Sequence, residues 1–577
     1  MPPWLLRFAR LRLAWLLLLV VGLYSPIFTA TPTLDDRVGL QALSQSTVAP
    51  LKHAPWDLYR ICEPFDQATR SLETWGAIPW YFDPDANLVH FRPVSSLLLA
   101  FDYWLAPGQA WWSALHGLGW YAVLIAGLRR LYRRWFDERW AAGLAVALFA
   151  LDDTHTFTVG WAANRHLLLC ACAAVWGWLA HLRWREEGWA LGRWWSVLLF
   201  SLGFLSGEAM VGLFSYIVVD ALARAPGPLA ARLWPLRDAL VVVLVWAALY
   251  LGLGYGTHGS GVYDHPLEEP VAFLMAVIRW VPIHWLAQFT PIPSDPAAAV
   301  MIEPDLAPVL ILTTLPPALA LAWWGWKTLA DTPRARPLML AVVANLMVMA
   351  AGMPGDRGLL ATGIGGSALT VMLVQALTRT RWQRGVGTVV LVVHLFLPVL
   401  GVPARAHLFT TIGPAWDRVA QHMESVDPNK PLVMLTTPGM LGSVYFMFAR
   451  HQTGHAVPPR IEQIGSTHAE VRLRRTASQE LELQTSGHFT STFDDLPCRE
   501  PSLPFVAGAV HKLAVGRVTV ISIGADGLPT ALRLELNRPV DELQFAKWTD
   551  RGFEPLPLPP VGSEIELPAT SLVPPGV

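Results

Sequence analysis

Two adjacent carboxylates, Asp35 and Asp36, follow the first long apolar segment of the chain. That segment, residues 13–30, is long enough to cross a bilayer, and three arginines precede it. Because positive residues stay on the cytoplasmic side, we expect the carboxylates to emerge on the opposite face, at the membrane surface. There, mutual repulsion and nearby lipid favour a carboxylate that accepts a proton, as a general base does. The alternative is that the acidic pair only marks where a helix meets water.

The composition indicates an integral membrane protein. The 577 residues have a mean hydropathy of +0.38, and 53% are hydrophobic against only 15% charged. The apolar residues form repeated long runs, which excludes a soluble protein of several domains. A net charge of −1 gives no sign of a nucleic-acid partner.

Hydropathy and arginine placement together predict about 11 transmembrane helices. The expected spans are residues 13–30, 111–128, 140–151, 167–182, 194–205, 210–222, 239–253, 306–326, 338–353, 359–377 and 386–402. Every second connection is rich in arginine, which predicts a cytoplasmic N-terminus and an extracytoplasmic C-terminal region. A bacterial inner membrane, with that region in the periplasm, fits this orientation.

The expected fold class is a polytopic α-helical membrane protein with a soluble, β-rich C-terminal domain. The transmembrane domain covers residues 1–402, with outer loops at about 31–92 and 255–305, and an amphipathic segment at 273–289. Residues 403–577 form an extracytoplasmic α/β to β-rich domain with a short helix at 416–426. Buried or alternating runs predict its strands at 431–437, 469–474, 481–483, 518–522 and 531–536.

Ionisable residues recur at the outer ends of the predicted spans. They are Arg92, Asp152, Asp153, His155, Arg165, His166, Glu208, Asp356 and Arg357. Charges at membrane depth are costly and usually face a cavity or a partner. Carboxylates beside arginines suit transfer from a lipid phosphate, because a hydroxyl acceptor needs a base and the leaving phosphate needs cations. The guanidinium group matches phosphate with two parallel hydrogen bonds.

Two further possibilities concern metals and disulfides. Asp35, Asp36, Asp153 and His155 are a candidate site for a divalent cation, and hard oxygen ligands favour Mg²⁺, Mn²⁺ or Ca²⁺ over Zn²⁺. Four cysteines form no metal pattern. Among them, Cys62 and Cys498 both fall in predicted extracytoplasmic regions, where a disulfide between them can form.

Several short motifs resemble those of the multi-spanning C-type glycosyltransferases. They are Phe91-Arg92-Pro93-Val94-Ser95-Ser96-Leu97, Ala150-Leu151 through His155-Thr156, Gly160-Trp161 with Arg165, Ser206-Gly207-Glu208, and Asp356-Arg357-Gly358-Leu359-Leu360. Within that family the chain is most similar to the O-mannosyltransferases that carry tetratricopeptide repeats and to their bacterial relatives. The resemblance covers most of residues 10–400.

The resemblance implies an outer-facing site and a polyprenyl-phosphate-linked sugar as donor. It implies that Asp35 carries the base, assisted by Asp36, and that transfer inverts the sugar configuration. Expected to bind the donor phosphate are Arg92, Arg165, Arg357 and Glu208, with Asp153, His155 and His166 in support. The acceptor is a protein, a lipid or a polysaccharide.

The chain also departs from the family pattern. Gly207 and His166 stand where lysines are usual, Asp152-Asp153 replaces a His-Pro pair, and the β-rich region replaces the repeats. These departures leave open a changed donor or a member that no longer catalyses. The alternative functions are a transporter or flippase for a lipid-linked intermediate and a non-catalytic protein of envelope assembly.

Overall fold

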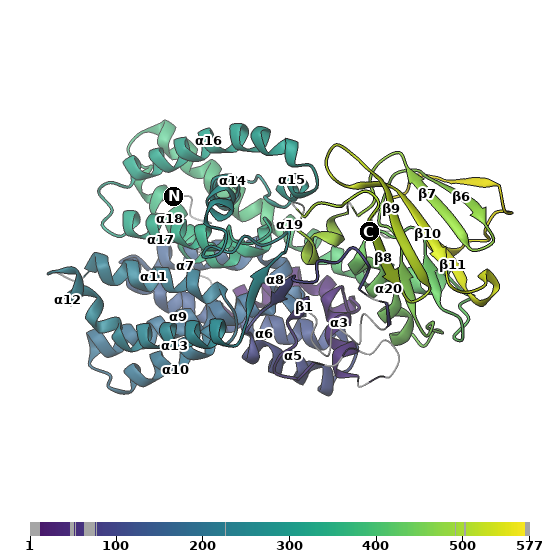
Figure 1. Ribbon diagram of the computed structural model, residues 1–577. Helices are drawn as coiled ribbons and strands as arrows, with labels where there is room; N and C mark the ends of the chain where they lie inside the picture. Colours follow the sequence, from purple (N-terminus) through teal and green to yellow (C-terminus); the bar gives the residue numbers. More distant parts are fainter. Residues whose placement is uncertain are drawn as a thin grey trace. The chain divides into compact units, whose positions relative to one another are not determined.

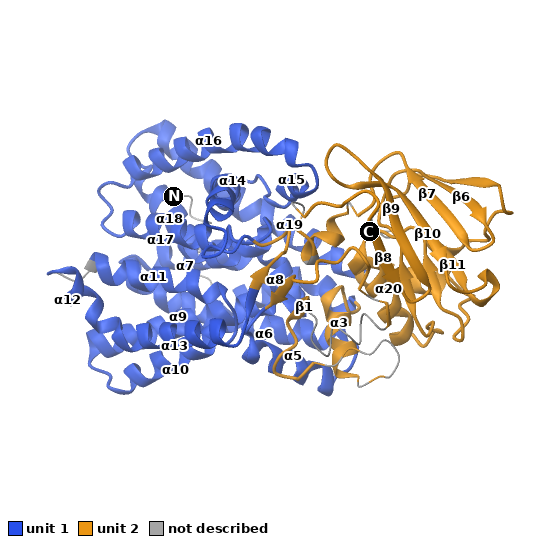
Figure 2. Ribbon diagram, in the orientation of Figure 1, with its two compact units in different colours: residues 1–30, 90–256, 264–410 blue, residues 31–89, 257–263, 411–577 orange. Residues whose placement is uncertain are grey.

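The computed structural model of the chain describes residues 12–44, 46, 51, 53–62, 75–76, 78–224, 227–490, 492–500 and 503–571. The chain forms two compact units (Figure 2). Unit 1 comprises Met1–Ala30, His90–Gly256 and Asp264–Thr410, and unit 2 comprises Thr31–Val89, Thr257–Tyr263 and Thr411–Val577. The predicted domain boundary near residue 402 stays a prediction; residue 402 lies inside a continuous helix, α19 (Arg381–His422).

Unit 1 is helical (Figure 1). Besides the first part of α19, its α-helices are α2 (Leu13–Leu23), α5 (Pro93–Leu105), α6 (Ala110–Trp135), α7 (Arg139–Leu151), α8 (Thr156–Gly160), α9 (His166–Glu187), α10 (Leu191–Phe204), α11 (Ala209–Arg224), α12 (Leu229–Leu233), α13 (Arg237–Gly252), α14 (Pro270–Phe289), α15 (Ala299–Ile302), α16 (Ala307–Thr328), α17 (Ala335–Met349) and α18 (Leu359–Ala376). Its 3-10 turns are η1 (Ser25–Thr29), η2 (Asp153–His155), η3 (Ala162–Arg165), η4 (Trp234–Leu236), η5 (Asp295–Ala298), η6 (Pro304–Leu306) and η7 (Asp356–Gly358).

The chain is a polytopic α-helical membrane protein, as predicted. In the described residues, 6 helices are long and apolar enough to cross a bilayer by length and composition, and four shorter apolar helices accompany them. The count of 11 stays a prediction. The segment expected to be amphipathic, residues 273–289, belongs to the 20-residue α14, whose hydropathy of 1.5 puts it among those six.

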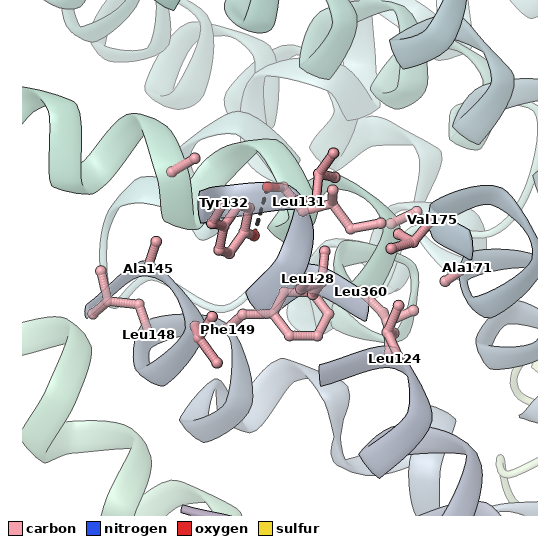
Figure 3. Packing of buried hydrophobic residues seen from close by; sticks show 14 of the residues in the cluster. Leu124, Leu128, Leu131, Tyr132, Ala145, Leu148, Phe149, Ala171, Val175 and Leu360 are labelled. Atoms are coloured by element: carbon pink, nitrogen blue, oxygen red, sulfur yellow. Dashed lines mark hydrogen bonds between the residues drawn. The ribbon is translucent and has the colours of Figure 1, made fainter. Parts of the chain in front are cut away.

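Helices α9 and α18 form the buried centre of unit 1, whereas α13 and α16 are largely exposed. Exposed leucines and valines on α13 and α16 suit contact with lipid tails. Figure 3 shows the packing around α6, α7 and α9, where Leu124, Leu128 and Phe149 are fully buried. Three glycines of α18 allow close approach: a Cβ at Gly366 would lie 2.6 Å from the Gln288 side chain.

Unit 2 contains three sheets. Its elements are α3 (Asp35–Leu43), β1 (Arg60–Cys62), β2 (Asn87–Val89), β3 (Gly256–His258), β4 (Leu432–Met434), α20 (Met440–Gln452), β5 (Ile461–Gln463), β6 (Val471–Ala477), β7 (Glu480–Thr485), η8 (Phe493–Cys498), β8 (Val510–Leu513), β9 (Gly516–Ile523), β10 (Pro529–Leu536), η9 (Val540–Glu542), β11 (Gln544–Thr549), β12 (Gly552–Pro555) and β13 (Glu564–Leu567). The sheet orders are β1-β2-β3, β13-β6-β7-β10-β9-β8 and β12-β11-β4-β5.

The β-rich C-terminal prediction is confirmed. The six-stranded sheet is antiparallel throughout, and its alternating strands put Leu481, Leu483, Leu532 and Leu534 into the core. The four-stranded sheet is mixed, because β4 pairs in parallel with both β5 and β11. Sequence periodicity did not predict α20, whose residues Phe446, Met447 and Phe448 are buried.

Candidate functional site

Asp35 begins helix α3 and is held by a tyrosine from the C-terminal part of unit 2. The Tyr445 hydroxyl donates a hydrogen bond of 2.7 Å to the Asp35 Oδ1 atom. Directly before it, Leu34 has φ +41° and ψ −115°, a conformation that costs a β-unbranched L-residue on the order of 1–3 kcal/mol. This strain turns the chain into α3 at the acidic pair. The helix N-terminus favours the ionised form of a carboxylate.

Asp36 and Arg37 have different surroundings from Asp35. The Asp36 Oδ2 atom accepts hydrogen bonds from the Thr33 hydroxyl at 3.2 Å and the Thr33 N–H at 3.4 Å, which closes the start of α3. Arg37, 2% exposed, pairs with Asp417 at 2.7 Å. Of the two adjacent carboxylates, Asp36 therefore has a clear structural task, and Asp35 is the better candidate for chemistry.

A second group of charges lies in unit 1, around Arg405. Its guanidinium pairs with Asp153 at 2.9 Å, with Asp295 at 3.2 Å and, at its third nitrogen, with Asp356. Asp356 is 1% exposed and also accepts hydrogen bonds from the Ser294 N–H and hydroxyl, both at 2.7 Å. The absence of a side chain at Gly401 lets the Asp153 carboxylate lie close to helix α19, since a Cβ at Gly401 would lie 2.7 Å from that carboxylate.

Burial and neighbouring carboxylates act on the proton affinity of this group. Burial raises the pKa of Asp153, with the charge of Asp152 adding to the effect and Arg405 opposing it. Burial likewise raises the pKa of Asp295, helped by the charge of Asp356. Three carboxylates around one guanidinium give a net charge of −2 when all are ionised.

A cavity of about 170 Å³ opens beside this cluster, within unit 1. Its polar lining includes Asp152, Asp153, Gln288, Asp356 and Arg405. An apolar wall faces them, contributed by residues such as Ile292, Val393, Leu397 and Pro398. The cavity offers hydrogen-bond acceptors for hydroxyl groups next to apolar side chains, an arrangement suited to an amphiphilic ligand.

Two of the predicted phosphate-binding arginines are engaged by carboxylates. Arg92 pairs with Glu208 at 2.8 Å, and His90 lies 3.3 Å from the same carboxylate. Burial opposes ionisation of Glu208, but Arg92 and His90 outweigh it and lower its pKa far below the usual range. Arg165, 3% exposed, pairs with the buried Asp102 at 2.5 Å.

Arg357 differs from these two arginines. It lies in η7 directly after Asp356, and its backbone carbonyl accepts a hydrogen bond of 2.9 Å from the Thr158 hydroxyl. Within the described part of the chain, no ion pair to its guanidinium is found. Its charge is therefore available to an anionic ligand.

The predicted supporting histidines lie inside unit 1. His155 is fully buried, and its Nδ1 atom lies 2.9 Å from the Tyr121 hydroxyl. Burial lowers the pKa of His155, so the ring is neutral near pH 7. His166 begins α9, with Nδ1 3.3 Å from the Ala163 carbonyl.

The predicted divalent-cation site stays a prediction. Asp35 and Asp36 belong to unit 2, whereas Asp153 and His155 belong to unit 1. The described residues contain no group of three or more His, Cys, Asp or Glu side chains able to hold a metal ion.

Sequence reasoning missed three residues of these clusters: Asp295, Arg405 and Tyr445. Arg405 stands near the outer end of the last predicted span, the position that singled out the other charges, so the same criterion could have found it. Tyr445 had no such signal. Its partner lies 410 residues away in the sequence.

Comparison with known proteins gives likenesses of fold at low identity. ArnT from Cupriavidus metallidurans bound to undecaprenyl phosphate matches at TM-score 0.40 and 12% identity, over 78% of this chain and 89% of that one. An Archaeoglobus fulgidus oligosaccharyltransferase matches at TM-score 0.42 and 13% identity, over 80% of this chain and 64% of that one. The mycobacterial arabinofuranosyltransferase AftD matches at TM-score 0.35 and 14% identity, over 74% of this chain and 31% of that one.

No family model and no curated protein matches the chain. At these TM-scores we draw no functional conclusion from the structural matches. They are C-type glycosyltransferases of the multi-spanning kind, the family that the sequence motifs resemble.

Proposed function

We propose that the chain is a membrane glycosyltransferase that moves a sugar from a polyprenyl-phosphate donor to an acceptor on the extracytoplasmic side. The observation that carries the proposal is the state of Asp35. Its carboxylate begins a helix after a strained residue, and one of its oxygens is held by Tyr445 at 2.7 Å. Strain of this kind concentrates at functional sites, and a positioned carboxylate is what a general base requires.

In the proposed reaction, Asp35 takes the proton of the acceptor hydroxyl. The acceptor oxygen forms a bond to the anomeric carbon as the bond from that carbon to the donor phosphate breaks. Attack on the face opposite the phosphate inverts the configuration. The proton ends on Asp35, and the electron pair of the broken bond leaves on the phosphate.

Arg357 is the residue we propose for the leaving phosphate. Its guanidinium has no ion pair among the residues that the structure describes, so it can give two parallel hydrogen bonds to the phosphate. Arg92 and Arg165 would first have to release Glu208 and Asp102. The apolar wall of the unit 1 cavity offers a place for isoprenoid units of the donor.

The orientation of the chain belongs to this proposal. Cys62 is disulfide-bonded, which supports an oxidising compartment for the first outer loop. Its predicted partner Cys498 has a side chain outside the described residues. Reporter tags near Arg133, Gly188 and Thr332 should respond as cytoplasmic, and tags near Gly259 and Gly527 as external. A cytoplasmic signal at Gly527 would contradict the orientation.

The test is sugar transfer by the purified protein in lipid nanodiscs. Envelope extract supplies the acceptor, and a radiolabelled polyprenyl-phosphate sugar supplies the donor. We expect the parent to transfer label and Asp35→Asn to lose about 10²–10⁴-fold in kcat, with donor affinity unchanged. Asp36→Asn is the matched control. Equal rates for Asp35→Asn and the parent would contradict the proposal. Donor movement across vesicles without transfer would indicate the transporter alternative.

A further inference from the structure

The polar side of the unit 1 cavity contains two buried groups whose hydrogen-bonding capacity is not used within the protein. Gln288 on α14 and Ser367 on α18 line the cavity, and each is only 5% exposed. The Gln288 Oε1 atom accepts a hydrogen bond of 2.6 Å from the Thr362 hydroxyl. Among the described residues, neither the Gln288 Nε2 atom nor the Ser367 hydroxyl has a hydrogen-bond partner. Because unpaired buried polar groups are costly, this pair indicates a partner that enters the cavity, either water or a ligand.

The backbone of α18 fixes the Gln288 amide group at the cavity. A Cβ at Gly366 would lie 2.6 Å from the Gln288 Cδ atom and 2.7 Å from its Nε2 atom, so any other residue there would displace the amide. Gly366 directly precedes Ser367 on the same helix. The amide group and the Ser367 hydroxyl are therefore close together in the lining.

Asp152 adds a hydrogen-bond acceptor to this lining. Its Oδ1 atom accepts hydrogen bonds from the Thr154 N–H at 3.0 Å and the Thr154 hydroxyl at 2.7 Å, and it forms no ion pair with a described residue. The carboxylates of Asp153 and Asp356, by contrast, are paired with Arg405. The cavity thus presents an amide donor, a hydroxyl and a carboxylate that is not shared with a guanidinium.

We propose that the unit 1 cavity binds an uncharged sugar ring, with Gln288 and Ser367 as specificity-determining residues that form hydrogen bonds to its hydroxyl groups. This inference rests on the proposed function and names the class of sugar that the donor carries. A cavity of about 150 Å³ can hold a benzene ring, so the cavity of about 170 Å³ has room for one six-membered ring. Apolar residues such as Val393 and Leu397 face the carbon-bound hydrogens of that ring.

The charges of the lining disfavour an acidic sugar. Asp152, Asp153 and Asp356 repel a negative ligand, and the only guanidinium in the described lining, that of Arg405, is already shared among three carboxylates. Burying a charge without a partner costs far more than burying a hydroxyl group that finds one. A hydroxyl group can accept from the Gln288 amide and donate to the Asp152 carboxylate, whereas a carboxylate can only accept. A uronic acid ring is therefore excluded.

The experiment measures binding of tritiated hexyl glucoside, an uncharged ring joined to a short apolar chain, to the full chain in lipid nanodiscs. Empty nanodiscs give the background. The competitors are hexyl glucuronide, which adds a carboxylate to the ring, and hexanol, which has no ring. We expect unlabelled hexyl glucoside to compete at least about tenfold more strongly than either.

Three results with the parent protein overturn the inference, and none needs a variant to fold. Equal competition by hexyl glucuronide contradicts the uncharged class of sugar. Equal competition by hexanol shows that only the apolar chain is bound. No saturable binding of hexyl glucoside shows a cavity that holds only water.

Ser367→Ala and Gln288→Met test the two residues. Because the Ser367 hydroxyl has no partner in the described protein, its removal should not lower the unfolding temperature but should weaken hexyl glucoside binding about fivefold. Gln288→Met should weaken binding about tenfold, while the Thr362 hydroxyl keeps its hydrogen bond of 3.0 Å to the Leu359 carbonyl. Ser196→Ala, at a buried serine of α10 outside the lining, is the matched control and should bind like the parent. Parent affinity in both cavity variants overturns the inference.

The inference and the proposed function fail in different measurements. Binding of hexyl glucoside is measured without a donor phosphate and without transfer. Full transfer activity in Asp35→Asn overturns the proposed function and leaves the binding result in place. Equal binding of the neutral and the acidic probe overturns the inference and leaves the transfer result in place.

Discussion

Unit 1 and unit 2 both gather carboxylates, but they hold them in different ways. In unit 1, Asp153, Asp295 and Asp356 surround the guanidinium of Arg405. In unit 2, Asp35 is held by the Tyr445 hydroxyl, and Asp495 by hydroxyl and backbone N–H groups. In unit 1, burial and neighbouring carboxylates raise the pKa of Asp153 and Asp295, although the charge of Arg405 opposes the rise. A neutral donor such as the Tyr445 hydroxyl fixes the position of a carboxylate oxygen without adding a countercharge. The two units thus show two ways of fixing a carboxylate, by a shared guanidinium in unit 1 and by hydroxyl and backbone N–H donors in unit 2.

The largest effect should come from removing the centre of the unit 1 cluster. Arg405→Met leaves three carboxylates without their shared countercharge, and we expect the free energy of unfolding to fall by about 3 kcal/mol or more. The loss should be smaller at pH 5 than at pH 8, because the raised pKa of Asp153 and Asp295 lets them protonate in mild acid. The loss in free energy of unfolding is measured by denaturation of both proteins in detergent micelles at the two pH values. Arg379→Met, at a side chain 80% exposed, is the control, and equal stability of the two variants would contradict the scaffold role.

Lysine substitutions at two arginines of unit 1 should have different effects, one on stability and the other on donor binding. Arg165→Lys loses the close pair with the buried Asp102, so the free energy of unfolding should fall by about 1.5–3 kcal/mol. Arg357→Lys should leave stability within about 0.5 kcal/mol of the parent but raise the donor Kd about tenfold. Donor binding and thermal unfolding are measured on the same preparations. The reverse pattern would make Arg165 the donor-binding residue, the role that the family resemblance also allows.

Ionisation of the Asp494 carboxylate in unit 2 should lower the free energy of unfolding, and the neutral variant Asp494→Asn should raise it. Because the folded pKa of Asp494 is raised to about 7, the native state keeps a proton that the unfolded chain has already lost. Parent stability therefore falls as pH rises from about 4 to 7 and stays lower above 7. At pH 8 the free energy of unfolding of Asp494→Asn should exceed that of the parent by on the order of 1–2 kcal/mol, which appears as a higher unfolding temperature. At pH 4 the two proteins should be equally stable. A variant less stable than the parent at pH 8 would contradict the assignment.

The smallest effect tests the division of labour within the acidic pair. Asp36→Asn weakens the hydrogen bonds that close the start of α3 and should reduce stability by about 0.5–1 kcal/mol. If Asp35 alone takes the acceptor proton, as proposed, the kcat of Asp36→Asn should stay within about threefold of the parent. Urea unfolding and the transfer assay are read side by side. A loss of activity as deep as that of Asp35→Asn would show that the two carboxylates act together.

Local patterns predicted most of the fold. Long apolar runs gave the helices of unit 1, and the alternation at 481–483 and 531–536 gave strands β7 and β10. The segment of α14 at residues 273–289 was predicted to be amphipathic, and Arg279, His284 and Gln288 interrupt its apolar sequence. In the structure His284 and Gln288 are buried, so the helix does not present them to water. Periodicity cannot distinguish a polar residue that faces solvent from one that packs inside.

The candidate site was predictable only in part. Asp35 and Asp36 were found because a span ends just before them and because they match a family motif. The sequence could not show which of the two carboxylates binds a tyrosine, since Tyr445 is 410 residues from Asp35 and nothing in the sequence around Tyr445 marks this contact. Arg405 was overlooked although it pairs with three aspartates that come from three separate connections. Such convergence is a property of the folded chain and leaves no periodic trace in the sequence.

The distance along the chain between Asp35 and its tyrosine also orders events during biosynthesis. A ribosome adds about 5–20 residues each second, so the 410 residues that separate the partners take roughly 20–80 s to make. Throughout that time the nascent chain already contains Asp35 and Asp36, yet it lacks the hydroxyl group that binds the Asp35 carboxylate. Every helix of unit 1 precedes Tyr445, so the membrane part can be inserted before the base is set. If Asp35 is the base, as proposed, activity has to wait for synthesis of the segment that carries Tyr445, and a fragment released before that point would be inserted but inactive.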